Sequence, residues 1–478
     1  MEWNGFLEKN RDEMIRALQR VIRINSEQKD RAVSDDGSVY PFGRGVQEAL
    51  EETLNIGREL GFEVKNVDNY GGHIDFPGTG DKIMAVIGHL DVVPAGNGWS
   101  RDPYGGEIED GRIYGRGTLD DKGPVISCLF AMKSLKDAGF VPKSTIRLIL
   151  GLDEESGWKG IRYYFEKEKR PDLGFTPDAD FPLINGEKGM LIFDLAKKFG
   201  KAPADGLRLS SVRGGTAPNS VADHCRAVLS GAGTGGYESV KETIAGFREE
   251  TGYKINFKGI GKSLEITAAG TAAHGASPEK GLNAISIMME LLGRLNFVSE
   301  DQNDFVSFYN KYIGFCLKGE KLGIDFSDDI SGDLVFNVGM INADTEAGSI
   351  TVNIRYPVSC ESESIFGAME PALNDYNMGI VKNEDKAPLY IDAGDPLIKT
   401  LMKVYRDHTG DESSEPLVIG GGTYARATPG IVAFGALFPG DEDLMHQKDE
   451  CLSLERFDLM TKIYAEAIYK LASEEYND

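Results

Sequence analysis

The chain has 478 residues, more than a single hydrophobic core usually organises, so we expect two domains. Its 52 basic and 76 acidic residues give a formal net charge of -24, which argues against nucleic acid or an anionic membrane as a partner. Hydrophobic residues make up 41% of the chain and 58 residues are glycine, as expected for a soluble globular protein with many turns.

The amino-terminal segment MEWNGFLEKNRDEM has too few consecutive apolar residues for a signal peptide, and no later run is long enough to cross a bilayer. The cysteines are odd in number, scattered and without a Cys-x-x-Cys pair. This pattern favours reduced thiols and argues against a thiolate zinc site. We therefore expect a cytoplasmic protein in which each cysteine is a small buried side chain: Cys128, Cys225, Cys316, Cys360 and Cys451.

The first part of the chain alternates helices with strands. Apolar stripes predict helices over residues 6–24 and 46–60, and the second helix is expected to end at Gly61. Two short strands follow, over residues 62–67 and 70–76, and then a strongly apolar run, IMAVI, predicts a buried parallel strand. This order predicts an α/β sheet that is covered by helices on both faces.

Histidine and acidic residues follow the ends of the predicted strands. After IMAVI, alternation along the extended chain places His89 and Asp91 on the same side. The next apolar strand, residues 146–150, is followed by Glu154 and Glu155. Because ligands of open α/β sheets bind at the carboxyl ends of strands, we expect a site at this edge.

Two further acids extend this pattern. Asp120 lies in the glycine-rich loop 115–123, before a predicted helix over residues 124–135, and Asp178 follows a later strand end. A single His-x-Asp is more often a surface pair, but the repetition at successive strand ends favours a functional site. Imidazole and carboxylate groups are ligands that suit a divalent cation.

The order of predicted strands and helices changes after Glu187, which indicates a second domain inserted into the first. Within it the apolar patterns predict a helix over residues 282–295, a hairpin, and several strands: 207–212, 222–229, 264–269, 335–341 and 349–356. Alternation of helices and strands resumes near residue 387, with a helix that opens at Asp395-Pro396, a strand over residues 431–437 and a closing helix over residues 456–471.

Eight segments, taken together and in order, carry a family resemblance. They are GHLDVVPAG, YGRGTLDDKGP, LDEESGW, PDADFPLINGEKG, APNSVAD, TAAHGASPEKGLNA, GGGTYAR and FPGDEDLMHQ. Over nearly its whole length the chain is similar to the dinuclear metallopeptidases that include aminoacylases, acetylornithine deacetylases, succinyl-diaminopimelate desuccinylases and carnosinases. Within these it resembles the PepV-type dipeptidases.

The resemblance implies a mixed-sheet α/β/α catalytic domain in two parts, residues 1–187 and 387–478, with an inserted α+β lid domain over residues 188–386. It also implies two divalent cations, zinc in the first place, with manganese or cobalt compatible with the same ligands. His89 and Asp178 match the ligands of one cation, Glu155 and His446 match those of the other, and Asp120 matches the bridging carboxylate.

Further roles follow from the same resemblance. Asp91 is expected to hydrogen-bond the imidazole of His89 and fix its tautomer, and a cis peptide is expected between Asp120 and Asp121. Glu154 matches the general base that takes a proton from the metal-activated water. One departure is that His446 is followed by Gln-Lys-Asp-Glu, where the family often has Asn-Glu.

The inserted domain contributes residues that only the resemblance singles out. His274 matches the residue that stabilises the oxyanion, and Asn219 and Arg355 match positions that contact the substrate. On the sequence alone, His274 would be an ordinary loop histidine and Arg355 a surface arginine. Three other histidines match no motif and are expected to be structural: His73, His224 and His408.

The resemblance thus predicts a metal-dependent dipeptidase that cleaves the peptide bond of short peptides and works as a monomer, without nucleic acid or membrane partners. One alternative is an N-acyl amino-acid deacylase of the aminoacylase or desuccinylase type, which would share every metal ligand. An alternative of another class is a non-catalytic relative that binds peptides or metal without turnover; the complete set of ligands and the base argue against it.

Overall fold

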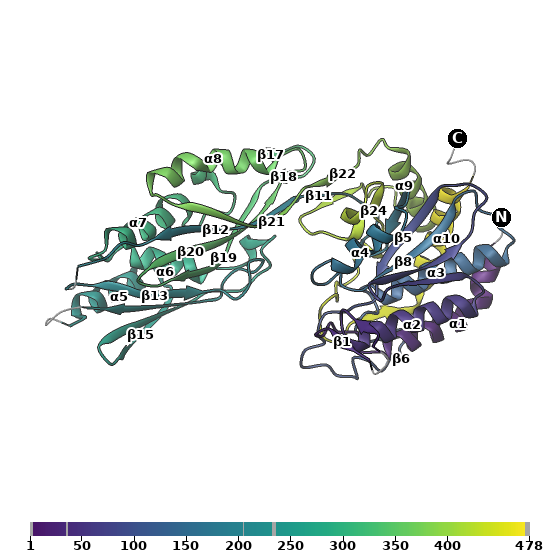
Figure 1. The fold of residues 1–478 in the computed structure, drawn as a ribbon, viewed down its shortest axis with the longest axis horizontal. Coiled ribbons are helices and arrows are strands. Elements are labelled where there is room, and N and C mark those ends of the chain that lie inside the picture. The colour runs from purple at the N-terminus through teal and green to yellow at the C-terminus, as the bar shows by residue number, and fades with distance from the viewer. Residues whose placement is uncertain (1–2, 35–36, 204, 232–235, 474–478) are drawn as a thin grey trace. The chain divides into compact units, whose positions relative to one another are not determined.

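The computed structural model describes residues 3–34, 37–203, 205–231 and 236–473, and these residues form two compact units (Figure 1). Unit 1 contains the chain up to Gly186, Tyr390–Leu417 and the chain from Gly422 onward. Unit 2 contains Glu187–Leu389 and the short segment Val418–Gly421. The units divide close to the predicted boundaries at residues 187 and 386. The assignment of unit 1 as catalytic domain and unit 2 as lid stays a prediction.

Unit 1 is built on a mixed sheet of nine strands, three of which (β11, β22 and β23) include residues at the boundary that are assigned to unit 2. Its order is β22-β11-β24-β9-β5-β8-β4-β3, and β23 also pairs with β11. The central strands β24, β9, β5 and β8 run parallel, whereas β4 is antiparallel to β8 and β3, and β11 is antiparallel to β24. The strands are β3 (Glu63–Val67), β4 (Gly71–Phe76), β5 (Ile83–His89), β8 (Thr145–Gly151), β9 (Leu173–Thr176), β11 (Ile184–Glu187), β22 (Leu389–Tyr390), β23 (Leu417–Ile419) and β24 (Ile431–Ala433).

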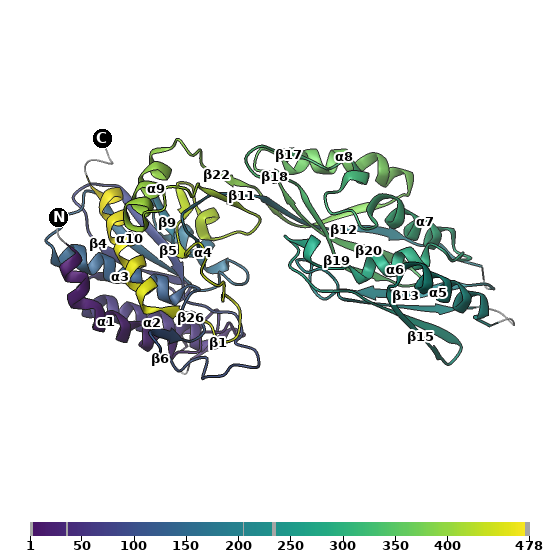
Figure 2. The same cartoon turned by 180° about the vertical axis from the view of Figure 1, so that it is seen from behind.

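Helices cover both faces of this sheet, which confirms the predicted α/β architecture. Neighbouring glycines in β4 show the two faces: a Cβ atom on Gly71 would lie 3.6 Å from the ring of Tyr164 in α4, and one on Gly72 would lie 3.0 Å from Leu50 in α2. Helices α1, α3 and α10 join α2 in one core, and α9 packs against α10 (Figure 2). The helices are α1 (Asn4–Ile22), α2 (Arg44–Glu59), α3 (Lys122–Asp137), α4 (Lys159–Lys167), α9 (Pro396–Thr409) and α10 (Leu454–Ala472).

The strand predicted over residues 431–437 is in fact two strands. Strand β24 ends at Ala433, and β25 (Ala436–Leu437) pairs instead with β10 (Ala179–Asp180). Gly435 separates them with φ of 83°, and a Cβ atom there would lie 2.4 Å from the ring of Phe181. The change of direction at this glycine ends the first strand, and the continuous apolar pattern conceals it.

Unit 2 is built on an antiparallel sheet of eight strands in the order β15-β16-β14-β13-β19-β20-β12-β21. Its strands alternate: Leu191, Phe193 and Leu195 of β12 are buried, whereas the residues between them are half-buried. The predicted hairpin is confirmed as β19 and β20. The strands are β12 (Gly189–Lys198), β13 (Arg208–Gly214), β14 (His224–Ser230), β15 (Lys254–Ile260), β16 (Ser263–Ala269), β19 (Val335–Ala343), β20 (Ala347–Tyr356) and β21 (Gly379–Lys386).

Four helices share a core with the buried face of this sheet. The helix predicted over residues 282–295 is shorter than expected, because Asn283 caps its first turn by accepting the N–H of Ile285 and the helix ends before Gly293. The helices of unit 2 are α5 (Glu238–Thr251), α6 (Ala284–Leu292), α7 (Glu300–Phe308) and α8 (Ser362–Asp375).

Short strands complete the two units: β1 (Ala32–Val33), β2 (Val39–Tyr40), β6 (Glu107–Glu109), β7 (Arg112–Tyr114), β17 (Ser327–Asp328), β18 (Gly332–Asp333) and β26 (Cys451–Ser453). Among the residues that the structure describes, no helix combines the length and the apolar character that crossing a membrane requires.

Candidate metal centre

Three parallel strands of unit 1 deliver the predicted site residues to one edge of the sheet. His89 is the last residue of β5, which pairs in parallel with both β8 and β9. Glu154 and Glu155 follow the end of β8, and Asp178 follows the end of β9. Because parallel strands end at the same edge, residues far apart in the sequence meet there.

Each of the five predicted ligands lies within 3.5 Å of at least one other. His89 Nε2 is 2.9 Å from Asp120 Oδ1 and 3.5 Å from Asp178 Oδ2. The other carboxylate oxygen of Asp120 is 2.9 Å from His446 Nε2, which lies 3.0 Å from Glu155 Oε1. Asp120 therefore presents one oxygen to each imidazole, the arrangement expected of a carboxylate that bridges two cations.

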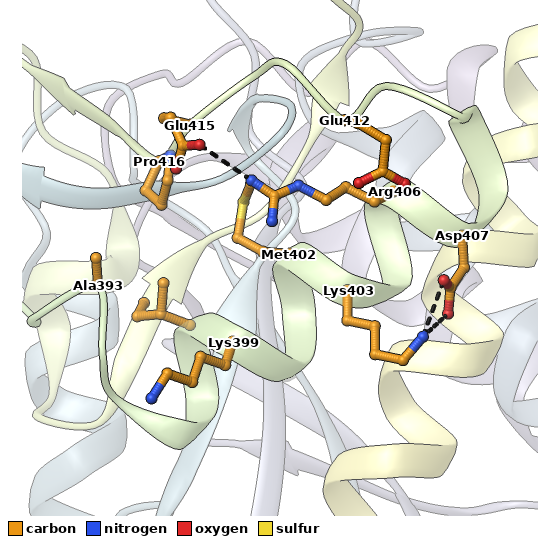
Figure 3. Close-up of a pocket in the computed structure, with 10 residues that line it drawn as sticks. Ala393, Lys399, Met402, Lys403, Arg406, Asp407, Glu412, Glu415 and Pro416 are labelled. Atoms are coloured by element: carbon orange, nitrogen blue, oxygen red, sulfur yellow. Dashed lines mark hydrogen bonds and ion pairs between the residues drawn. The ribbon is translucent and has the colours of Figure 1, made fainter.

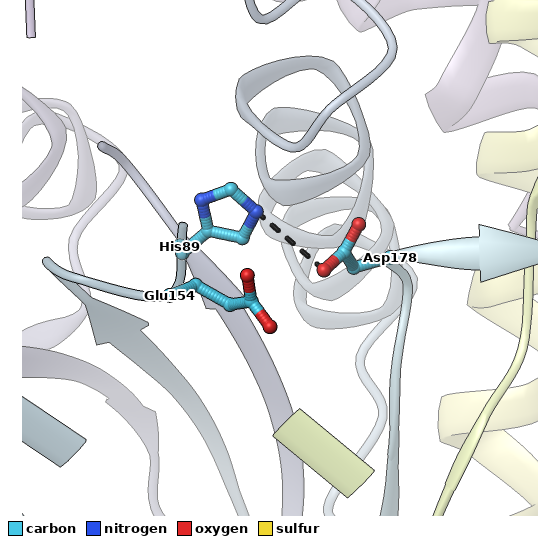
Figure 4. A group of neighbouring side chains, drawn as sticks. All are labelled: His89, Glu154 and Asp178. Atoms are coloured by element: carbon cyan, nitrogen blue, oxygen red, sulfur yellow. Dashed lines mark ion pairs between the residues drawn. The ribbon is translucent and has the colours of Figure 1, made fainter. Parts of the chain in front are cut away.

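The neighbouring glutamates point to two different groups of side chains. Glu154, His89 and Asp178 each offer a ligand atom within 4.8 Å of the others (Figure 4). Glu155 instead forms such a group with His89 and Asp120. The two groups share His89 but differ in their second acid, which is Asp178 for Glu154 and Asp120 for Glu155.

Asp91 holds this arrangement in a way that differs in detail from the prediction. His89 Nδ1 is 3.0 Å from the backbone carbonyl oxygen of Asp91 and 3.4 Å from its carboxylate. A carbonyl oxygen only accepts hydrogen bonds, so Nδ1 carries a proton, and in the neutral imidazole Nε2 is the nitrogen that can bind a cation. The buried carboxylate of Asp91 instead accepts the backbone N–H groups of Glu154 and Glu155, both at 3.2 Å.

The backbone before His89 allows a second buried acid to approach. Asp121 Oδ2 accepts the backbone N–H of His89 at 3.1 Å. A Cβ atom at Gly88 would lie 2.5 Å from that same oxygen and 2.4 Å from the side chain of Val125, so only glycine fits here. The peptide bond between Asp120 and Asp121 is cis, as the resemblance implied.

Two residues that organise the glutamate loop were not predicted. Asp153 accepts the backbone N–H groups of Lys159 at 2.6 Å and Gly160 at 2.9 Å, and so closes the loop onto the start of α4. The indole N–H of Trp158 donates to the backbone carbonyl of Glu154 at 2.8 Å. An aspartate a few residues ahead of a helix is the kind of signal that could have indicated the first contact.

The pKa values show how strongly the cluster disfavours its own negative charge. Burial first, and then the neighbouring carboxylates, raise the pKa of Glu154 well above its usual range and that of Glu155 to about 7. Contacts with Asp120 and Glu155 raise the pKa of His446 to about 11. The cluster contains more carboxyl groups than imidazoles, and bound cations would stabilise the carboxylates that burial disfavours.

A direct observation shows that the residues suit a metal. His89 Nε2 and Asp120 Oδ1 are both buried, and neither has a hydrogen-bond partner among the described residues. When the imidazole is neutral, with its proton on Nδ1, the two facing atoms are both lone-pair donors. A cation is the species that satisfies both.

The three predicted residues of the inserted domain lie together in unit 2. The backbone N–H of Gly275, next to His274, donates to the carbonyl of Asn219 at 2.7 Å. A Cβ atom on Gly420 would lie 3.4 Å from Ala276 and 3.8 Å from the side chain of Arg355. The ligand cluster lies in unit 1, so the contact of these residues with a substrate stays a prediction.

Two of the remaining histidines have structural partners. His73 is buried in β4 with Nδ1 2.8 Å from the hydroxyl of Tyr164, and His408 Nε2 is 2.8 Å from a carboxylate oxygen of Glu466. His224 is exposed at the start of β14. None of the three belongs to the groups of potential metal ligands found in the described residues.

A cavity of about 370 Å³ beside α9 contains none of the predicted site residues (Figure 3). Four of its charged side chains form two pairs: Lys403 with Asp407 at 2.6 Å and Arg406 with Glu415 at 3.3 Å. Because these pairs neutralise each other, the cavity presents no net charge from them to a ligand.

Comparison with known proteins agrees with this geometry. The model of peptidase family M20/M25/M40 matches residues 85–470. The chain belongs to this family. Membership confirms the predicted metallopeptidase family and makes the protein a peptidase that depends on divalent metal.

Relatives of this peptidase span its whole length. It is 38% identical to "Putative dipeptidase YtjP" of Bacillus subtilis (strain 168) over 474 residues, 99% of this chain and 100% of that protein. Human carnosine dipeptidase 1 has a TM-score of 0.56 at 15% identity, covering 98% of both chains. The aminoacylhistidine dipeptidase of Vibrio alginolyticus has a TM-score of 0.56 at 16% identity, covering 95% of both chains. The two structures share the fold of this peptidase, which confirms the predicted fold class.

Proposed function

We propose that this peptidase is a metal-dependent dipeptidase, which hydrolyses the peptide bond of short peptides. The observation that carries the proposal is Asp120, whose two carboxylate oxygens face the imidazoles of His89 and His446 at 2.9 Å each. Two further acids complete the set. The relative of full length and 38% identity, which bears the name "Putative dipeptidase YtjP", supports the choice of substrate.

We propose two divalent cations as cofactors, zinc in the first place, with manganese and cobalt compatible with the same ligands. His89 and Asp178 would hold one cation, Glu155 and His446 the other, and Asp120 would contact both. When bound, the cations would supply Lewis acidity that polarises the peptide carbonyl and makes a water molecule easier to deprotonate.

The protein's own groups would move the proton. Glu154 would accept a proton from the attacking water and return it to the leaving amine nitrogen. Its environment suits a base that must bind and release a proton, because burial raises the pKa of its carboxyl group. Asp91 orients Glu154 by accepting its backbone N–H at 3.2 Å.

Residues of unit 2 would handle the substrate. His274 would donate a hydrogen bond to the oxyanion that forms from the peptide carbonyl. Arg355 would pair with the carboxylate at the end of the dipeptide, since a guanidinium binds a carboxylate with two parallel hydrogen bonds. Asn219 would contribute a further polar contact, and its carbonyl already fixes the turn beside His274.

The test is a substrate panel with metal-free protein reloaded with Zn²⁺, Mn²⁺ or Co²⁺. Dipeptides with a free amino terminus should be cleaved with a higher kcat/KM than tripeptides or N-acyl amino acids. Preference for N-acyl amino acids would identify a deacylase instead. Metal binding without turnover of any of the three substrate classes would identify a non-catalytic relative.

We infer also that the protein works as a monomer in the reducing cytoplasm. One chain carries both the ligand cluster and the proposed substrate residues, so no second copy is needed to complete the set. All five cysteines are free thiols, which suits a reducing compartment. Light scattering of the reduced protein, with the mass of one chain as the expected result, tests the first point.

A further inference from the structure

The segment that carries His446 returns to the loop that carries Asp120 and is anchored there by Glu450. The side chain of Glu450 is fully buried. Its carboxylate accepts the backbone N–H groups of Leu119 at 2.8 Å and Gly117 at 3.1 Å, and that of Asp120 at 3.4 Å. One carboxylate therefore sets the path of the chain up to the proposed bridging ligand.

The rest of this loop is tied to the same residue. Arg116 is buried, and its Nη1 donates to Glu450 Oε2 at 2.7 Å, with the guanidinium lying over the ring of Trp99. The backbone carbonyl of Glu450 accepts the N–H of Gly115 at 2.9 Å, directly beyond the pairing of β7 with β26. The loop from Gly115 to Asp120 is thus built around Glu450.

The short segment between the two functional positions is held in an unusual conformation. His446 has φ of 61° and Asp449 has φ of 57°, both in the left-handed region that residues with a side chain rarely occupy. Asp449 is fixed from outside, since its carboxylate accepts the backbone N–H of Ser100 at 2.7 Å. Such a backbone persists only where surrounding contacts determine it, and Glu450 supplies the contacts at its far end.

We propose that Glu450 is a positioning residue that fixes the separation of Asp120 from His446, and thereby the affinity of the metal centre for its cations. Glu450 lies four residues after His446 in the sequence and contacts Asp120 across 330 positions of the chain. The two side chains that it positions stand 2.9 Å apart, His446 Nε2 from Asp120 Oδ2. The inference rests on the proposed function for the role of these two residues as metal ligands.

The central experiment measures cation affinity directly, with Zn²⁺ competed against a chromophoric chelator. In Glu450→Gln the side chain keeps its shape, but an amide NH₂ group must face either Arg116, in place of Oε2, or the backbone N–H of Leu119, in place of Oε1. We expect Zn²⁺ affinity to fall by about 10- to 100-fold, the usual effect of losing a group that orients a ligand. Affinity within about 2-fold of the wild type would overturn the proposal.

A second readout separates positioning from a merely structural role. If Glu450 acts through the cations, kcat of Glu450→Gln should rise towards the wild-type value as the concentration of Mn²⁺ is increased, while KM for the dipeptide stays unchanged. A raised KM with normal cation affinity would contradict this. Glu450→Ala, which leaves the loop N–H groups without their acceptor, should weaken affinity further if it folds; the glutamine variant decides the question if it does not.

Asp411→Asn is the matched control in unit 1. The carboxylate of Asp411 also accepts backbone N–H groups, those of Ser413 at 3.0 Å and Ser414 at 3.1 Å, in the loop after α9. It should lower stability without changing Zn²⁺ affinity. Equal losses of affinity in both variants would show general destabilisation and overturn the proposal.

The outcomes also distinguish this inference from the proposed function. A wild-type chain that binds Zn²⁺ but cleaves no dipeptide, with weaker binding in Glu450→Gln, would end the dipeptidase proposal and support the positioning role. A wild type that cleaves dipeptides, together with unchanged Zn²⁺ affinity in Glu450→Gln, would support the dipeptidase proposal and overturn the positioning role. A wild type without affinity for Zn²⁺ would overturn both.

Discussion

The two units of this peptidase bury their strands in different ways. All seven residues of β5 in unit 1 are buried, because helices cover both faces of a sheet whose central strands are parallel. In unit 2, β14 alternates between buried residues and exposed or half-buried ones, because only one face of its antiparallel sheet packs against the helices. A continuous apolar run and an alternating one therefore report two different architectures in one chain.

This difference explains where polar side chains can gather. Parallel strands end at one edge, so His89, Glu155 and Asp178 arrive there from three neighbouring strands. In unit 2 neighbouring strands run in opposite directions, and the proposed substrate residues lie partly in loops, as His274 does, and partly within a strand, as Arg355 does. We expect substitutions of the proposed site residues in unit 1 to affect metal binding and bond cleavage, and those of the proposed substrate residues in unit 2 to leave metal binding intact.

The largest expected effect comes from Asp120→Ala in unit 1. Because Asp120 presents one oxygen to each imidazole, its loss should release both cations and reduce dipeptide hydrolysis to the rate without enzyme. Metal content per chain, measured by mass spectrometry of the dialysed protein, checks the first point. Asp137→Ala, at the other end of α3, should keep both metals; two bound cations in Asp120→Ala would contradict the bridging role.

Glu154→Gln should come next. It removes the proposed base but keeps the size of the side chain, so kcat should fall by about 10²- to 10⁴-fold while both cations stay bound. Stopped assays with a dipeptide, together with metal content, provide the measurement. Glu168→Gln in the same unit is the control and should retain activity. Near-normal turnover of the Glu154 variant would remove this residue from the role of base.

His274→Ala tests the proposed role of unit 2 in catalysis. Loss of one donor to an oxyanion usually lowers kcat by about 10²- to 10³-fold. Because His274 belongs to unit 2, metal content and metal affinity should not change. His224→Ala removes an exposed histidine of the same unit and should behave as the wild type. A loss of bound metal in the His274 variant would contradict the proposal that residues of unit 1 bind the metal and residues of unit 2 bind the substrate.

The smallest expected effect is on the free energy of unfolding rather than on catalysis. It concerns His73, a buried histidine of unit 1 that lies outside the ligand cluster. Burial, with a contribution from Arg147, lowers the pKa of His73 to about 4 from the ordinary value of 6.5. A histidine whose pKa is lower in the folded state stabilises the fold above pH 6.5, and that contribution disappears as the pH falls towards 4. The shift corresponds to at most about 3 kcal/mol.

Urea unfolding between pH 7 and pH 4.5 measures how steeply the free energy of unfolding changes with pH. In His73→Gln the part of the slope due to this residue should vanish, because glutamine does not titrate and can still bond to Tyr164. An identical pH dependence in wild type and variant would show that His73 does not carry the effect.

The site illustrates what sequence patterns contain and what they omit. The ends of the apolar strands are local features, so His89, Glu154 and Asp178 could be placed near one sheet edge from the sequence. Which atoms make the contacts could not be predicted from the sequence. The imidazole of His89 bonds to the backbone carbonyl of Asp91, and the carboxylate of Asp91 accepts the backbone N–H of Glu154. The departure from Asn-Glu after His446 gave no sign that Glu450 would anchor the Asp120 loop.

The sequence alone thus determined the α/β class, the order of most elements, the family and the residues that face one another at the candidate centre. These depend on periodicity and on local motifs, which a single segment expresses by itself. Tertiary structure alone decided that Val418–Gly421 joins unit 2, that Gly435 divides a strand and that Glu450 links two distant loops. Each of these depends on a hydrogen bond or a close approach between segments far apart in the chain, and no local pattern records such a contact.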